Sequence, residues 1–309
     1  MKPNNEAILK ICLLAAFSDG SNNDDEREKF KQIIEGLGEE ISPNLYHDVL
    51  FKKITLDETV KSLKTQEDKK LAYEMAVFVC DADGSVNLKE KEFLDELKSY
   101  LSINSNYSTE VDNVGAELAE IPIKNEIIDL VQEDEKEKQI NKMILNYAIL
   151  NGALELLPQS IATMAIIPLQ TKMVYRIGKY FNYDLDSGHI KEFIATVGLG
   201  FTSQVLEGYA RKLIGGFAKK IIGKTGKKIV STATGAAFSF GSTYAIGKAA
   251  LSYYSSGRKL DNLQLKNLFS KFSDESKSLY TKYQGEIQAK ARNININEII
   301  PMIKGNTGI

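Results

Sequence analysis

Apolar positions near the start of the chain recur at helical spacing, and the pattern occurs twice. Ile8, Ile11, Cys12 and Ala15 lie three or four residues apart, which predicts an amphipathic helix. The helix is followed by an Asp-Gly pair, a short polar gap and a second amphipathic run that begins with acidic residues. The same order returns 64 residues later, so that Asp19-Gly20 superimposes on Asp83-Gly84. The N-terminal segment is therefore an internal repeat of helical hairpins.

Each turn of the repeat has the signals that end one helix and begin the next. Gly20 and Gly84 supply the left-handed conformation that commonly closes a helix. Asn87 with Glu90 forms a capping-box pattern, and Asn23 with Glu26 repeats it in the first copy. Capping alone explains the acidic and amide residues of both turns.

Divalent-cation binding is the alternative explanation of these turns. Read as an EF-hand loop from Asp81, the second copy has oxygen donors at most ligand positions, but Val86 replaces the required glycine. In the first copy Phe17 stands at the first ligand position, where it cannot coordinate a cation. Neither copy is a standard EF-hand. A differently built site for a divalent cation such as Ca²⁺ would draw on Asp81, Asp83, Glu92 and Asp19.

The second half of the chain has a different pattern, with long stretches that lack charge. The longest is the 19-residue stretch from Ile229 to Gly247, close to the roughly 18 residues that indicate a membrane span. Its residues are mostly small, and two adjacent rows of small residues recur at every fourth position. Gly235, Gly241 and Gly247 belong to these rows and are expected to allow close helix packing. Soluble core and membrane insertion both fit this stretch.

A basic amphipathic stretch precedes these rows. Between Arg211 and Val230 there is no acidic residue, and apolar residues alternate with cations at near-helical spacing. The cations are Arg211, Lys212, Lys219, Lys220, Lys224, Lys227 and Lys228. Such a stretch is typical of binding to an anionic membrane surface. The alternatives are the acidic half of the same chain, a partner protein or, with no recognisable nucleic-acid-binding fold around it, nucleic acid.

Net charge divides the chain more sharply than composition does. The formal charge is only −2, but residues 1–140 hold 31 acidic and 17 basic residues, whereas residues 141–309 hold 10 and 22. The change from −14 to +12 predicts two modules with different partners. We expect an all-α protein with an acidic domain at 1–120, a charged linker helix at 121–142, a basic domain at 143–260 and an amphipathic tail at 261–309.

No catalytic motif is present in the sequence. His47 and His189, the only two histidines, lie in unrelated contexts. The Gly-Lys-Thr at 223–225 lacks the glycine that a phosphate loop requires, because that position is Ala218. Cys12 and Cys80 lie in apolar runs and are predicted to be buried and reduced. We therefore expect a protein that is not an enzyme.

Two resemblances to known families rest on these motifs. The repeated apolar helix, Asp-Gly turn and acidic helix start over residues 1–120 resembles the TerB-like (tellurite-resistance) helical family. That resemblance implies an all-helical fold, metal binding and a role in stress response near the inner membrane of bacteria. The segments "LQTKMVYRIGKYF" and "TYAIGKA" within residues 143–260 are similar to a YcjF-type family associated with Era-like GTPases. This second resemblance implies a membrane-associated accessory domain and a GTPase partner acting in trans.

The combined expectation is a cytoplasmic adaptor, peripheral to or partly inserted in the inner membrane. An acidic interaction or cation-sensing module would be coupled to a membrane-docking module, with a membrane surface, a membrane protein or a GTPase as partner. A soluble interaction protein without a membrane role is the alternative. Oligomerisation is compatible with either interpretation.

Overall fold

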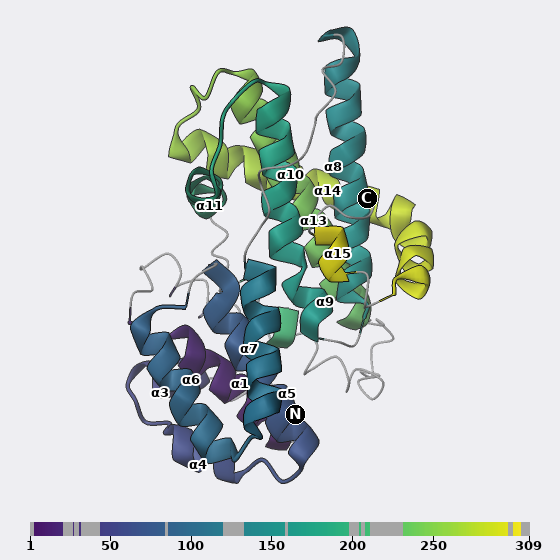
Figure 1. The fold of residues 1–309 in the computed structure, drawn as a ribbon. Coiled ribbons are helices and arrows are strands. Elements are labelled where there is room, and N and C mark those ends of the chain that lie inside the picture. Colours follow the sequence, from purple (N-terminus) through teal and green to yellow (C-terminus); the bar gives the residue numbers. More distant parts are fainter. Residues whose placement is uncertain are drawn as a thin grey trace. The chain divides into compact units, whose positions relative to one another are not determined.

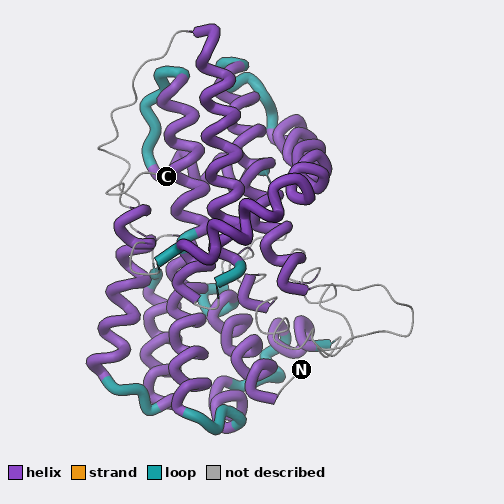
Figure 2. The backbone as a smooth tube through the Cα atoms, turned by 90° about the vertical axis from the view of Figure 1, so that its right-hand side faces the viewer, coloured by secondary structure: helices purple, strands orange, loops and turns teal. Residues whose placement is uncertain are grey.

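The computed structural model describes residues 3–20, 27, 31, 44–83, 86–119, 133–157, 160–197, 204, 208–210, 231–295 and 299–303. All regular structure in these ranges is helical, and they contain no strand (Figure 2). The predicted all-α class is confirmed. Two compact units divide the chain: Met1–Ala119 with Gly200–Thr232, and Glu120–Leu199 with Ala233–Ile309.

The first unit is built around α1. Its described helices are α1 (Pro3–Ala16), α3 (Leu45–Leu50), α4 (Leu56–Lys61), α5 (Gln66–Cys80), α6 (Leu88–Leu101) and α7 (Ser105–Ala119), with a 3₁₀ turn at Asp81–Asp83. Helix α1 packs against α3, α4, α5 and α6 (Figure 1). Ile8, Ile11 and Leu13 are fully buried, because a helix that is apolar on several faces can be covered on several sides.

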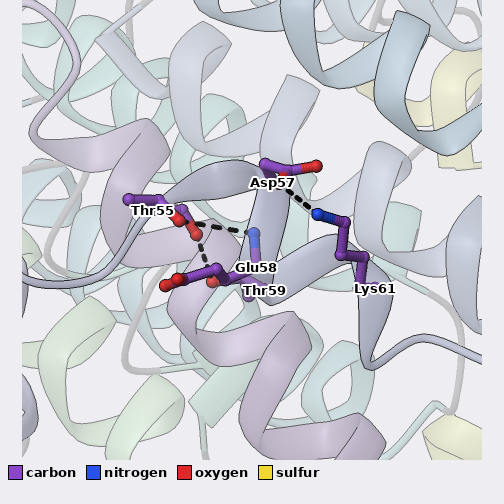
Figure 3. Close-up of polar contacts among 5 residues, drawn as sticks. All are labelled: Thr55, Asp57, Glu58, Thr59 and Lys61. Carbon is purple, nitrogen blue, oxygen red and sulfur yellow. Dashed lines mark hydrogen bonds and ion pairs between the residues drawn. The ribbon is translucent and has the colours of Figure 1, made fainter.

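Short polar motifs position the helices around α1. At the start of α4 the Thr55 hydroxyl accepts a hydrogen bond from the Glu58 amide at 3.3 Å, and the Thr55 carbonyl accepts one from the Thr59 hydroxyl at 2.7 Å (Figure 3). Lys61 pairs with Asp57 one turn away on the exposed side. The bond from the Thr55 hydroxyl satisfies the Glu58 amide, which the first helical turn leaves without an intrahelical partner.

The second unit contains the longest helices. They are α8 (Glu133–Glu155), α9 (Ser160–Met164), α10 (Ile166–Tyr180), α11 (Ser187–Thr196), α13 (Ser231–Ser255), α14 (Asn262–Asn293) and α15 (Ile299–Ile303). Helix α8 packs against both α10 and α14 (Figure 1). Helix α13 contacts α8 at Asn151, α10 at Gln170 and α14 at Tyr280. The core of the unit is therefore the packing of α8, α10 and α14 around α13.

Two features of the expected domain organisation take a different form in the structure. The predicted border at residue 142 falls inside α8, which runs without interruption from Glu133 to Glu155. The predicted tail (residues 261–309) contributes α14, which packs on α8 in the same unit. The reason is physical: charge changes along α8, but its inward face stays apolar at Ile140, Ile144 and Tyr147.

Candidate functional site

The structure brings the turns of the two repeats together in the first unit. The Asn87 side-chain amide donates a hydrogen bond to Asp19 Oδ2 at 3.2 Å, and Lys89 Nζ donates to the Asp19 backbone carbonyl at 3.1 Å. At the other ends of α1 and α5, Asn4 donates to Asp68, its own repeat equivalent. Helices α1 and α5 therefore run side by side in the same direction, and the turns that follow them meet.

The capping pattern of the second turn is confirmed in detail. Asn87 Oδ1 accepts hydrogen bonds from the Lys89 amide at 3.0 Å and the Glu90 amide at 3.1 Å. Glu90 Oε2 accepts one in return from the Asn87 amide at 2.8 Å. Gly20 has the left-handed conformation that its position predicted, with φ of +70°. The capped start of α6 holds Asn87 in place to reach Asp19.

The four candidate cation ligands have different surroundings. Asp81 is only 6% exposed, and its carboxylate lies against α7, where a Cβ added to Gly115 would stand 2.1 Å from Asp81 Oδ2. Asp19 is hydrogen-bonded to Asn87, and Glu92 is exposed on α6. Asp83 ends the 3₁₀ turn, and its side chain lies outside the described side chains. The described part of the chain contains no group of three or more His, Cys, Asp or Glu side chains that could hold a metal ion.

The two cysteines lie in the core of the first unit, as predicted. Cys12 and Cys80 are 0% and 1% exposed, and both are free thiols. Burial raises the pKa of the Cys12 thiol to about 12. Burial is also the main cause that raises the pKa of Cys80, and the nearby carboxylates of Glu90, Asp81 and Asp19 add to it. Both thiols are therefore protonated at neutral pH and act as small apolar groups.

The basic stretch lies outside the described residues. This holds for all seven of its cations: Arg211, Lys212, Lys219, Lys220, Lys224, Lys227 and Lys228. None of the helices that the structure describes is both long enough and apolar enough to cross a membrane.

The three glycines of the small-residue rows lie at close approaches between helices of the second unit. A Cβ added to Gly247 would stand 2.7 Å from Ile144 Cγ2 on α8. At Gly241 it would stand 2.7 Å from Ser276 Oγ on α14, and at Gly235 it would stand 3.0 Å from Glu155 Cγ on α8. Real Cβ atoms essentially never come within 3.0 Å of such neighbours, so α13 can approach α8 and α14 this closely at Gly247 and Gly241 only without side chains there.

Sequence reasoning missed a set of polar side chains that the fold buries. Asn151, Gln170 and Thr243 meet in the core of the second unit, and none of the three is exposed to solvent. Thr243 stood in one of the small-residue rows, which was the only signal of this contact in the sequence. Asn151 and Gln170 come from segments that read as apolar stretches, and their meeting point depends on how three helices pack.

Comparison with known proteins finds a family-level similarity for the first segment only. Residues 2–114 match the family model described as "Protein of unknown function (DUF533)", which is a TerB-like family. No curated protein and no solved structure matches the chain. The match spans the acidic repeat, from α1 into α7, and agrees with the TerB-like resemblance there. Residues 2–114 are thus similar to a TerB-like family of unknown function, and the GTPase-associated resemblance of residues 143–260 stays a prediction.

Proposed function

We propose that this protein is a non-enzymatic adaptor that docks on an anionic membrane surface through the basic stretch Arg211–Lys228. The observation that carries the proposal is the division of charge, −14 over residues 1–140 and +12 over residues 141–309, with seven cations and no acid in that stretch. Each Lys or Arg close to an anionic membrane contributes about 1 kcal/mol of attraction. Seven cations together are sufficient for reversible, salt-sensitive binding at the cytoplasmic face.

The packing of α13 favours docking over insertion. Every residue from Ser239 to Gly247 is buried against neighbouring helices of the second unit. The rows of small residues therefore have partners inside the protein, at Ile144, Ser276 and Glu155. Insertion of α13 into lipid would require the loss of these contacts. A peripheral mode leaves the bundle intact and assigns the lipid contact to the basic stretch.

The acidic segment of residues 1–120 is the partner-binding module in this proposal. Its TerB-like character extends the proposal to a stress-response role near the inner membrane, and a GTPase acting in trans is the partner class that the second resemblance implies. Because Asp19 is hydrogen-bonded to Asn87 and the Asp81 carboxylate lies buried against Gly115, we assign this segment to protein recognition. Cation sensing remains the competing role, and calorimetry with Ca²⁺ on the full chain tests it.

Vesicle flotation tests membrane docking directly. The full chain should float with vesicles that contain phosphatidylglycerol and should stay unbound with phosphatidylcholine vesicles. Raising the salt concentration should release it, because the attraction is electrostatic. Replacement of Lys219, Lys220, Lys224 and Lys227 by Gln should abolish flotation.

A matched control has the same charge change on exposed positions of α14: Lys271, Lys277, Lys282 and Lys290 replaced by Gln. This variant should float like the parent protein. Equal loss in both variants would show that net charge, not the basic stretch, drives binding. Absence of binding to any anionic vesicle would refute docking and favour the soluble alternative, in which the basic stretch binds an acidic protein surface.

A further inference from the structure

Three helices of the second unit contribute one buried amide or hydroxyl each to a common point in the core. Asn151 comes from α8, Gln170 from α10 and Thr243 from α13, and each is 0% exposed. We call these three residues the polar layer. Leu150, Leu169 and Ile246, which neighbour the three residues along their helices, are nearly or fully buried as well.

The hydrogen bonds within the polar layer all converge on Thr243. Asn151 Nδ2 donates to Thr243 Oγ1 at 2.9 Å and to the Ile166 backbone carbonyl at 3.3 Å. Gln170 Nε2 donates to the same Thr243 oxygen at 3.1 Å. Both amide groups are thus oriented by their nitrogen atoms. Their carbonyl oxygens, Asn151 Oδ1 and Gln170 Oε1, are buried and have no hydrogen-bond partner.

Reorienting the side chains does not give both carbonyl oxygens a hydrogen-bond donor. Thr243 has a single hydroxyl hydrogen, so it can serve at most one of the two carbonyl oxygens. Turning the Gln170 amide over would give its oxygen that hydrogen, but its two N–H groups would then lose their only acceptor in the layer. Asn151 Oδ1 would remain without a donor. A buried carbonyl oxygen without a partner is destabilising, and native proteins commonly satisfy such groups with a bound species.

We propose that the polar layer is an internal binding site for one small hydrogen-bond donor, a water molecule or an ammonium-sized monovalent cation. A water molecule would donate a hydrogen bond to the carbonyl oxygens, and a small cation would attract them by its positive charge. The layer contains no carboxylate, and its neutral oxygens suit water or a monovalent cation better than a divalent one. The bound species would connect α8 and α10, which contribute the two oxygens. This inference does not depend on membrane docking.

Magnetic resonance of the unaltered full chain, with ¹⁵N-labelled Asn and Gln, provides the deciding measurement. A long-lived water should give a cross-peak between the Asn151 side-chain amide and the water resonance. A bound cation should instead raise the melting temperature in ammonium or potassium chloride relative to choline chloride at equal ionic strength. The first result identifies water and the second identifies a cation. Absence of both overturns the proposal.

A pair of variants on α10 separates the site from general packing. Gln170→Met keeps the approximate shape and removes the amide, so the cross-peak or the cation-dependent shift should disappear. Thr171→Val is the control, because the Thr171 hydroxyl is equally buried but donates within its own helix to the Ile167 carbonyl at 3.1 Å. It should retain the signal. A signal that persists in Gln170→Met would also overturn the proposal.

Discussion

Gly247→Ala tests whether α13 needs glycine in order to pack against α8. The added Cβ would lie 2.7 Å from Ile144 Cγ2, 2.8 Å from Ile144 Cγ1 and 3.1 Å from Met173 Sδ. Ile144 and Met173 are both fully buried. The two Ile144 atoms are bonded directly to its Cβ, and a β-branched side chain has few rotamers into which it can move. The helices must therefore separate or Ile144 must leave its preferred rotamer.

Two effects of opposite sign set the magnitude. Replacing Gly by Ala inside a helix stabilises it by about 0.5–1 kcal/mol, since Gly loses more backbone freedom on folding. Overpacking a core by one methyl group costs about 1–3 kcal/mol. The expected net change at Gly247 is a loss of roughly 0–2.5 kcal/mol. In a unit of this size, each kcal/mol lowers the melting temperature by about 2–4 °C.

Gly285→Ala in α14 is the matched control. Gly285 is exposed, and a Cβ there would meet nothing within 4 Å. The control contains the same gain in helix propensity without the steric cost, so it should stabilise the protein by about 0.5–1 kcal/mol. The difference between the two variants in thermal or urea unfolding isolates the overpacking term, about 1–3 kcal/mol.

Ile144→Ala gives a second check through a double-mutant cycle. This change removes both contacting atoms of Ile144, so Gly247→Ala should cost less in its presence, with a coupling energy of about 0.5–3 kcal/mol. Equal stabilisation by Gly247→Ala and Gly285→Ala, or a coupling energy near zero, would refute the close approach of α13 and α8.

Three further predictions concern the first unit. Asn87→Ala should destabilise it by about 0.5–2 kcal/mol in urea unfolding, because the cap of α6 is lost; an unchanged midpoint would refute the capping role. An aromatic disulfide reagent should modify Cys12 and Cys80 only at the rate at which the unit opens, since both are buried, and an immediate reaction would contradict this. The folded pKa of Cys12 is raised from 9.0 to about 12, so its contribution to stability is complete below pH 9 and is lost as the pH rises towards 12. The free energy of unfolding should therefore fall in that window by up to about 1.4 kcal/mol per pH unit for this thiol. Cys12→Ala should make the free energy of unfolding fall less steeply between pH 9 and pH 12. An unchanged slope in this variant would contradict the raised pKa of Cys12.

Local signals in the sequence were sufficient for the described helices and for the capped turn before α6. The left-handed Gly20 and the capping box of Asn87 and Glu90 were predicted and are present, whereas Asn23, Glu26 and Gly84 of the same repeat lie outside the described residues. Burial of Cys12 and Cys80 followed from the apolar runs around them. These features depend on residues within a turn or two of each other, so the spacing of residue types along the chain determines them.

Contacts between distant residues were decided by the tertiary structure. Periodicity showed that Asp19 and Asn87 belong to equivalent turns, but only the parallel packing of α1 and α5 brings them within hydrogen-bonding distance. Asp81 was named as a candidate cation ligand because of its charge, and only the fold shows that its carboxylate lies against Gly115. Charge and residue type do not specify the direction in which a side chain points once several helices surround it.

The second unit shows most clearly which features the sequence determines and which the tertiary structure decides. The rows of small residues in α13 indicated that some helix would approach closely, and the chain alone identifies the glycines that permit it. Only the packed bundle selects Ile144 and Ser276 as the neighbours, and it alone joins Asn151, Gln170 and Thr243 across 92 residues of sequence. Helix formation depends on short-range backbone preferences, whereas the choice among helix partners depends on the shape and polarity of whole faces, which no local pattern contains.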